Sequence, residues 1–128
     1  MSVRIVRLGS DREPGEGLRI GTVRRPPRGV PKDRFAKDNW YDVWLPQLAP
    51  SAELVKQAQS ARSPKQWQAF ARRYRSEMGT ADNARLLILL AALSRQTNFS
   101  VGCYCEDENH CHRSLLRELL AEYGADVV

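Results

Sequence analysis

The chain has 128 residues, with 20 Lys or Arg against 15 Asp or Glu, and its formal net charge is +5. This length and an ordinary apolar fraction favour one globular domain over 1–128, large enough to bury a core without disulfides. No apolar run approaches the ~20 residues that span a bilayer, and the N-terminal "MSVRIVRLGS" lacks the apolar stretch of a secretory signal. We therefore expect a cytoplasmic protein with no membrane partner.

Positive charge is concentrated near the N-terminus. Residues 1–37 carry ten Lys or Arg against four acidic residues, whereas the remainder of the chain is close to neutral. A basic segment of this kind favours phosphate-bearing or otherwise anionic partners. A solvated, arginine-rich surface is the alternative that charge alone leaves open.

The first part of the chain predicts two strands and a basic loop. "VRIVRL" (3–8) and "LRIGTV" (18–23) alternate side chains with a period of two, as strands do. "RRPPRGVPKDR" (24–34) has three prolines and five basic residues, which predicts an exposed, irregular loop. The segment 38–50 receives no assignment, and we expect its two tryptophans in the core.

Three helices are predicted next. Ser51 caps the first, and "SPKQ" (63–66) opens the second with a serine cap and a proline in the first turn. The second helix carries an apolar stripe at helical spacing: Trp67, Phe70, Ala71, Tyr74 and Met78. The third helix, about 80–95, is apolar on every face except at Arg85, so we expect it to be covered on most sides.

The last elements predict the fold class. "FSVGCYC" (99–105) is β-prone and apolar, so it predicts a buried strand, and a final helix should run from about Cys111 to Tyr123. Strands that precede, alternate with and follow helices predict a single layered α/β domain. We expect a small, mostly parallel sheet flanked by helices.

All three cysteines and both histidines of the chain lie in ten residues, from Cys103 to His112. The segment should run from the end of a strand through the acidic loop "EDENH" into the first turn of a helix. Ligands of parallel sheets bind beyond the carboxyl ends of the strands, where helix N-termini attract anions and stabilise thiolates. The sequence therefore predicts a site at this junction.

One interpretation of the cluster is a thiol nucleophile. Cys111 or Cys105 would attack, with His110 or His112 as the base, and Arg113 would bind an anionic group. A cysteine-phosphatase loop that starts at Cys105 is excluded, because that loop needs an arginine six positions after the cysteine, where this chain has Cys111.

Metal and structural interpretations compete with the nucleophile. A metal such as zinc would use two or three of the clustered ligands Cys103, Cys105, His110, Cys111 and His112, with Cys105, His110 and Cys111 as the first choice. The spacing is not a standard zinc one, and an extended strand separates the sulfurs of Cys103 and Cys105 by roughly 6–7 Å. We therefore predict no metal and no other cofactor. In the structural interpretation Cys103 is a core residue and the imidazole of His112 binds a sheet carbonyl.

Four blocks of the sequence resemble a known family. "RIGTVRRPPRGVPKDR", "WLPQLAPSAEL", "WQAFARRYRSEM" and "VGCYCEDENHCHRSLLRELL" resemble, in order, the blocks of the domain-of-unknown-function 488 family (DUF488), in its YeaO-like branch. The resemblance covers the chain from about Arg19 onward, and "CHRSLL" after the "CYCEDE" segment is its most specific part. It implies a small, cytosolic, bacterial protein of α/β build, without an established activity.

The resemblance also implies which positions matter. The residues that match family motifs are Arg24, Pro27, Arg28 and Gly29 in the basic loop, and Cys111, His112 and Arg113 at the helix start. Many relatives have an Asp-Arg-Leu-Trp-Pro-Arg-Gly run. Here Val23, Arg25 and Pro26 replace its first, third and fourth residues, so no role is carried over for that acid or that indole.

These observations lead to one main hypothesis and two alternatives. We expect a site for a small anionic or nucleotide-like ligand, enzymatic or not, with Cys111, His112 and Cys105 as reactive groups. Arg113, Arg24 and Arg28 would bind the anion. The alternatives are a nucleic-acid-binding module that uses the basic loop and the arginines at 72–75, and a zinc-binding domain. The sequence predicts no oligomeric state.

Overall fold

A computed structural model describes all 128 residues. The strands are β1 (Val3–Arg7), β2 (Leu18–Gly21), β3 (Val43–Trp44) and β4 (Phe99–Cys103). The α-helices are α1 (Ala52–Ser60), α2 (Pro64–Met78), α3 (Ala81–Ser94) and α4 (His112–Glu122). Three short 3-10 helices complete the set: η1 (Lys32–Arg34), η2 (Pro46–Leu48) and η3 (Glu108–His110).

The four strands form one sheet in the order β1-β4-β2-β3, and every neighbouring pair is parallel. In the centre of the sheet Val101 of β4 lies opposite both Ile5 of β1 and Ile20 of β2. The predicted α/β fold with a small parallel sheet is therefore confirmed. The segment without an assignment contributes the short edge strand β3 and η2.

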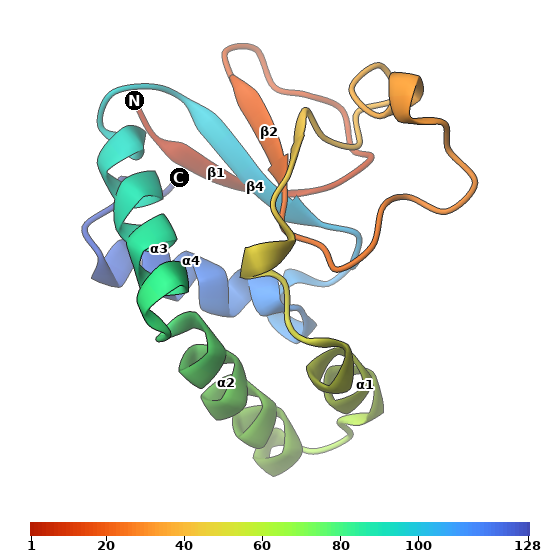
Figure 1. The fold of residues 1–128 in the computed structure, drawn as a ribbon, viewed down its shortest axis with the longest axis vertical. Helices are drawn as coiled ribbons and strands as arrows, with labels where there is room; N and C mark the ends of the chain where they lie inside the picture. The colour runs from red at the N-terminus through yellow and green to blue at the C-terminus, as the bar shows by residue number, and fades with distance from the viewer.

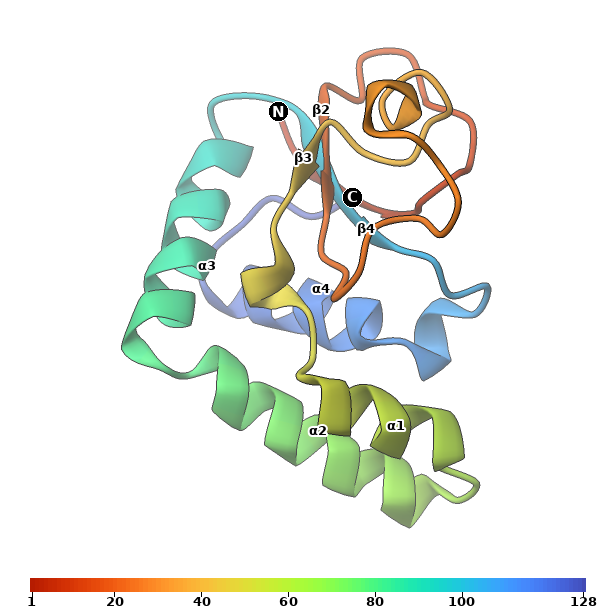
Figure 2. The ribbon, with the colours of Figure 1, turned by 45° about the vertical axis from the view of Figure 1, so that its right-hand side comes forward.

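The helices lie on one side of the sheet, and long loops lie on the other (Figures 1 and 2). On the helical side, Phe99 and Val101 of β4 belong to a core cluster of 15 buried residues that includes side chains from all four helices. Alternate residues of β4 point the opposite way, because successive side chains of a strand face opposite sides of the sheet. Ser100 therefore faces the loops.

A buried ion pair fastens the loops to this second face. Arg19 of β2 is fully buried, and its guanidinium donates to the carboxylate of Glu16 at 2.8 and 3.0 Å. The same guanidinium donates to the backbone carbonyls of Ser10 at 2.9 Å and Asn39 at 2.8 Å. The Ser100 hydroxyl donates to Glu16 at 2.8 Å. One side chain thus holds two loops against the sheet.

The predicted helix starts at α1 and α2 are confirmed. The Ser51 hydroxyl accepts from the N–H of Leu54, and the Ser63 hydroxyl accepts from the N–H of Gln66. The apolar stripe of α2 faces the core, where Phe70, Tyr74 and Met78 are buried. Because a capped start and a one-sided stripe agree at these helices, the sequence located them within a few residues.

Two burial predictions are wrong. The helix α3 is not covered on most sides, since its side chains Ile88, Leu89 and Leu93 are exposed. The apolar residues that α3 does bury are Leu87, Leu90 and Ala91. A helix that packs on one layer of the fold keeps its opposite side toward solvent. Trp44 is likewise exposed over 42% of its surface, on an edge strand.

None of the helices combines the length and apolar character needed to cross a bilayer.

Candidate functional site

The cysteine cluster forms where β4 ends and α4 begins. The strand ends at Cys103, two residues before the predicted end, and Cys111 is the N-cap of α4. Because the chain bends after Cys103, its sulfur lies only 3.7 Å from that of Cys105. The expected separation of roughly 6–7 Å on an extended strand was therefore wrong.

The three thiols differ in their access to solvent. Cys103 and Cys111 are buried in a second, smaller hydrophobic cluster with Leu8, Val23 and Tyr41, and Cys111 is only 2% exposed. Cys105 is exposed. A ligand arriving from solvent therefore meets Cys105 before the other two sulfurs.

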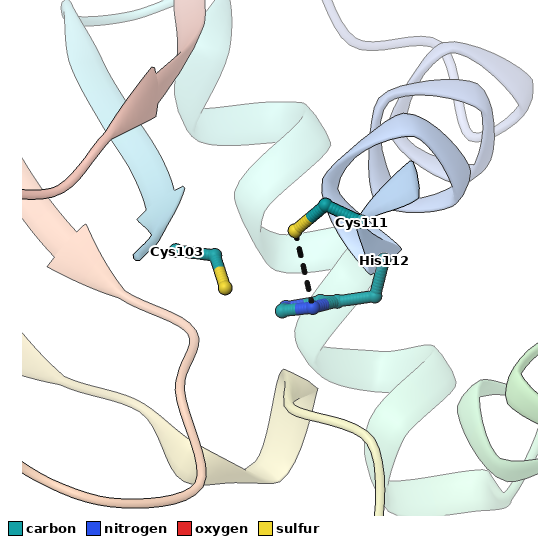
Figure 3. A group of neighbouring side chains, drawn as sticks. All are labelled: Cys103, Cys111 and His112. Carbon is teal, nitrogen blue, oxygen red and sulfur yellow. Dashed lines mark hydrogen bonds between the residues drawn. The ribbon is translucent and has the colours of Figure 1, made fainter. Parts of the chain in front are cut away.

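His112 is held in a defined tautomer. Its Nε2 lies 2.8 Å from the backbone carbonyl of Thr22 and 3.3 Å from the Thr22 hydroxyl. A carbonyl only accepts hydrogen bonds, so Nε2 carries the proton and Nδ1 has a free lone pair. Nδ1 faces the Cys111 sulfur at 3.8 Å (Figure 3). Burial lowers the pKa of His112 to about 4, so the imidazole is neutral at pH 7.

The contacts among the sulfurs concentrate negative charge on Cys105. Contacts with Cys105 and Cys111, together with burial, raise the pKa of Cys103 far above its usual range. For Cys111, the contact with Cys103 lowers the pKa, but the contact with Cys105 and burial of the thiol raise the pKa to about 11. Hydrogen bonds from both other thiols lower the pKa of Cys105, helped by the nearby charge of Arg113. Cys105 is thus the most acidic of the three.

The structure brings the predicted arginines to the same edge of the sheet but not onto the sulfurs. Arg113 is buried, and its guanidinium donates to the backbone carbonyl of Cys105 at 2.7 Å, while its Nε has no partner. Arg24 donates to the carbonyls of Pro50 and Ala49 at 3.0 and 3.2 Å. Arg28 is exposed and forms no hydrogen bond or ion pair.

The basic loop and the cysteine segment are nevertheless linked. The loop follows β2, and the cysteine segment follows β4, its parallel neighbour, so both leave the same edge of the sheet. The hydroxyl of Tyr104 donates to the backbone carbonyl of Arg25 at 2.9 Å. This bond places the loop directly beside the residue between Cys103 and Cys105.

Three side chains could hold a metal ion. Ligand atoms of Cys103, Cys111 and His112 all lie within 4.8 Å of one another. His110, the imidazole named in the sequence-based ligand set, is exposed and lies 3.1 Å from the carboxylate of Asp107. The structure therefore groups the other histidine with the thiols. The expected bond of His112 to a sheet carbonyl is confirmed by its contact with Thr22.

Two residues of this site were missed by sequence reasoning. Thr22 fixes the imidazole of His112 from a distance of 90 residues along the chain. Tyr41 packs in the same hydrophobic cluster as the buried sulfurs, and its hydroxyl has no hydrogen-bond partner. The position of Thr22 near the end of a predicted strand was the only local signal for it. Nothing in the sequence around Tyr41 indicated its place.

The fold and the cluster define a small parallel α/β protein with a thiol and imidazole centre at the carboxyl edge of its sheet. The family profile described as "Active DUF488-N3 subclade" matches residues 3–124. The chain therefore belongs to the DUF488 family, which confirms the resemblance of its sequence blocks.

Curated relatives support the same assignment. Uncharacterized protein Rv3073c of Mycobacterium tuberculosis and uncharacterized protein Mb3100c of Mycobacterium bovis are each 31% identical to the chain over 121 residues. The matches cover 92% of this chain and 92% of each relative. No solved structure gives a significant match.

Proposed function

We propose that the protein is a thiol-dependent enzyme that acts on a small anionic ligand at the carboxyl edge of the sheet, with Cys105 as the reacting group. The observation that carries this proposal is the arrangement of the thiols. Cys105 is exposed, and its sulfur lies 3.7 Å from that of the buried Cys103. A buried S–H group that donates to an exposed sulfur favours the thiolate there, and the thiolate is the nucleophile.

The other predicted reactive groups support Cys105 from behind. Cys111 and His112 are buried, so their role in this mechanism is to position the exposed thiolate and not to touch the ligand. Arg113 fixes the backbone of Cys105 through its 2.7 Å hydrogen bond and adds a positive charge close to the thiolate. The description of the matching subclade as active agrees with a chemically competent centre.

The basic loop supports an anionic ligand. Arg25 and Arg28 are exposed, and the loop is tied to Tyr104, next to the reacting thiol. Nearby acidic charge is partly neutralised, since Arg117 pairs with Glu108 at 2.8 Å. An arginine fork at this position would recognise a phosphate or carboxylate through paired hydrogen bonds.

The surface arginines of α2 give little support to the alternative of a nucleic-acid-binding module. Arg75 pairs with Glu118 and Glu122 of α4 at 2.7 and 2.9 Å, and Arg73 pairs with Glu53 and donates to Gln57. Arginines engaged with carboxylates add little positive potential toward a phosphate backbone. Arg72 is exposed and forms no ion pair, so the nucleic-acid alternative depends on the basic loop and this one arginine of α2.

Selective alkylation tests the proposal. In EDTA-containing buffer at pH 7, we expect iodoacetamide to modify Cys105 at least about tenfold faster than Cys103 or Cys111, because only Cys105 combines exposure with thiolate character. Mass spectrometry of the peptides gives the three rates. We also expect inorganic phosphate or a nucleoside diphosphate to slow the modification of Cys105.

The matched controls separate the thiol from the anion site. Cys105→Ser should remove the fast modification, and Arg28→Ala should leave it intact while weakening protection by phosphate. Equal modification of all three thiols in the folded protein would contradict the assignment of Cys105. Protection that is unaffected by Arg28→Ala and Arg25→Ala would remove the basic loop from the ligand site.

A further inference from the structure

Two of the distances between sulfur and nitrogen atoms of the cluster match the spacing of neighbouring ligands in a tetrahedral metal centre. Zinc binds thiolates at about 2.3 Å and imidazole at about 2.0 Å, so neighbouring ligand atoms around it are about 3.6–3.8 Å apart. The sulfurs of Cys103 and Cys105 are 3.7 Å apart, and the sulfur of Cys111 is 3.8 Å from Nδ1 of His112. Cys103, Cys111 and His112 lie within 4.8 Å of one another.

His112 is presented as a metal-binding histidine is. Its Nε2–H donates to the carbonyl of Thr22 at 2.8 Å, and its other nitrogen points with a free lone pair toward the sulfurs (Figure 3). Metal-bound histidines almost always donate the opposite N–H to a carbonyl or carboxylate, which fixes the ring and the tautomer. Here the fixing carbonyl comes from the end of β2, a separate element of the sheet.

The surroundings favour a soft cation. Three sulfurs and one neutral imidazole nitrogen select zinc-type ions over magnesium or calcium, which prefer oxygen ligands. Cys103 and Cys111 are buried in one hydrophobic cluster with Leu8, Val23 and Tyr41, so water has little access to their sulfurs. We therefore infer that Cys103, Cys105, Cys111 and His112 bind one zinc ion, in which Cys105 is the ligand on the solvent side.

This inference does not depend on the proposed function. A zinc ion could be bound whether or not Cys105 ever reacts with a ligand, and its presence is measured without an assay of activity. The zinc site and the thiol enzyme also predict different effects of substitutions in the cluster. Loss of a buried ligand should strongly weaken metal binding, whereas loss of the exposed Cys105 leaves three ligands, which is the number that catalytic zinc sites use.

The test measures metal directly. Protein without an affinity tag, purified with a non-thiol reductant, should contain about one zinc per chain by elemental analysis, as a closed four-ligand site predicts. Replacement by cobalt should give the intense visible bands of tetrahedral coordination and the near-ultraviolet bands of thiolate ligands. Chelator competition then yields the affinity of the wild-type protein.

The variants identify the ligands. Cys111→Ser and His112→Asn should lower zinc affinity at least about tenfold more than His110→Asn, the matched change at the exposed imidazole. Cys105→Ser should keep the cobalt visible bands and lose part of the thiolate absorption. Circular dichroism establishes that each variant folds, and the wild-type measurements stand independently of the variants.

Several outcomes would overturn the zinc site. Wild-type protein that neither contains zinc nor gains cobalt bands after loading would show a thiol cluster without metal. Iron or copper in place of zinc would overturn the identity of the ion. Loss of affinity in His110→Asn equal to that in His112→Asn would overturn the ligand set. Unchanged thiolate absorption in Cys105→Ser would remove Cys105 from it.

Discussion

At the scale of single residues, the most unusual feature of the chain is an ion pair without contact with solvent. Arg19 is the largest side chain that is fully buried, and Glu16 is 2% exposed. Besides pairing with each other, Glu16 accepts a hydrogen bond from the Ser100 hydroxyl, and Arg19 donates to two loop carbonyls. A buried pair is costly to leave half-satisfied, so removal of one partner should be strongly destabilising.

Glu16 should make the stability of the protein depend on pH in the acid range. Burial alone would raise the pKa of Glu16, but hydrogen bonds from Arg19 and Ser100 lower it from 4.5 to about 2. A carboxylate with a depressed pKa stabilises the folded state above pH 4.5 and loses that contribution as the pH falls toward 2. The contribution amounts to about 3 kcal/mol.

Glu16→Gln tests this at the residue level. We expect the variant to be less stable than wild type at pH 7 by about 3 kcal/mol, because Arg19 loses its charged partner. Between pH 4.5 and 2 the stability difference between the two proteins should shrink. Urea unfolding across that range measures it, with Glu118→Gln at an exposed pair as the control. A constant difference at every pH would show that the pKa of Glu16 is the same in the folded and unfolded states.

At the scale of elements, α2 and α3 show when a sequence pattern predicts burial. The apolar residues of α2 lie on one stripe, so the pattern alone identified the buried face. The residues of α3 are apolar all round, and such a pattern cannot say which side touches the sheet. The structure buries Leu87 completely and leaves Leu89 53% exposed.

Alanine substitutions in α3 should reveal this orientation. Leu87→Ala should lower the free energy of unfolding by about 2–5 kcal/mol, because it opens a cavity in the core. Leu89→Ala should change it by less than about 0.5 kcal/mol, since an exposed side chain has few contacts to lose. Chemical denaturation measures both variants, which have the same composition. Comparable losses would mean that Leu89 is covered in solution.

The positions of the strands could be predicted only in part from the local sequence pattern. The sequence located β1, β2 and β4, whose alternation or apolar character is clear, but not β3, which has two residues and pairs only with β2. It also extended β4 to Cys105, because nothing local announces the bend after Cys103. That bend is what brings the Cys103 and Cys105 sulfurs together, so the missed boundary had a chemical consequence.

At the scale of the whole molecule, the candidate site is built from segments far apart in the chain. The sequence predicted where the cysteines would gather, since a strand end followed by a helix start is a local feature. It could not predict that Thr22 holds His112 or that Tyr41 joins the cluster of the buried sulfurs, because these contacts exist only after the sheet and loops have assembled. The cluster is therefore a product of tertiary packing.

Gly21 determines where the ring of Tyr41 can lie, and Tyr41 belongs to the hydrophobic cluster that contains the buried sulfurs. A Cβ atom at this position of β2 would lie 2.4 Å from the ring of Tyr41, so Gly21→Ala must displace that ring. Tyr41 packs in the same cluster as Cys103 and Cys111. The substitution should lower the free energy of unfolding by about 1–3 kcal/mol, as overpacking does.

The same substitution should also expose the buried thiols. With the ring displaced, Cys103 and Cys111 should react with a thiol reagent faster in Gly21→Ala than in wild type under native conditions, measured by peptide mapping. Gly79→Ala is the control, because a Cβ there meets only ordinary contacts at 3.4 Å, at the end of α2. A destabilised Gly21→Ala with unchanged protection of both thiols would show that Tyr41 does not shield them. Retained stability with faster modification would instead assign the shielding to Tyr41 alone, without a wider role in the packing of the loops.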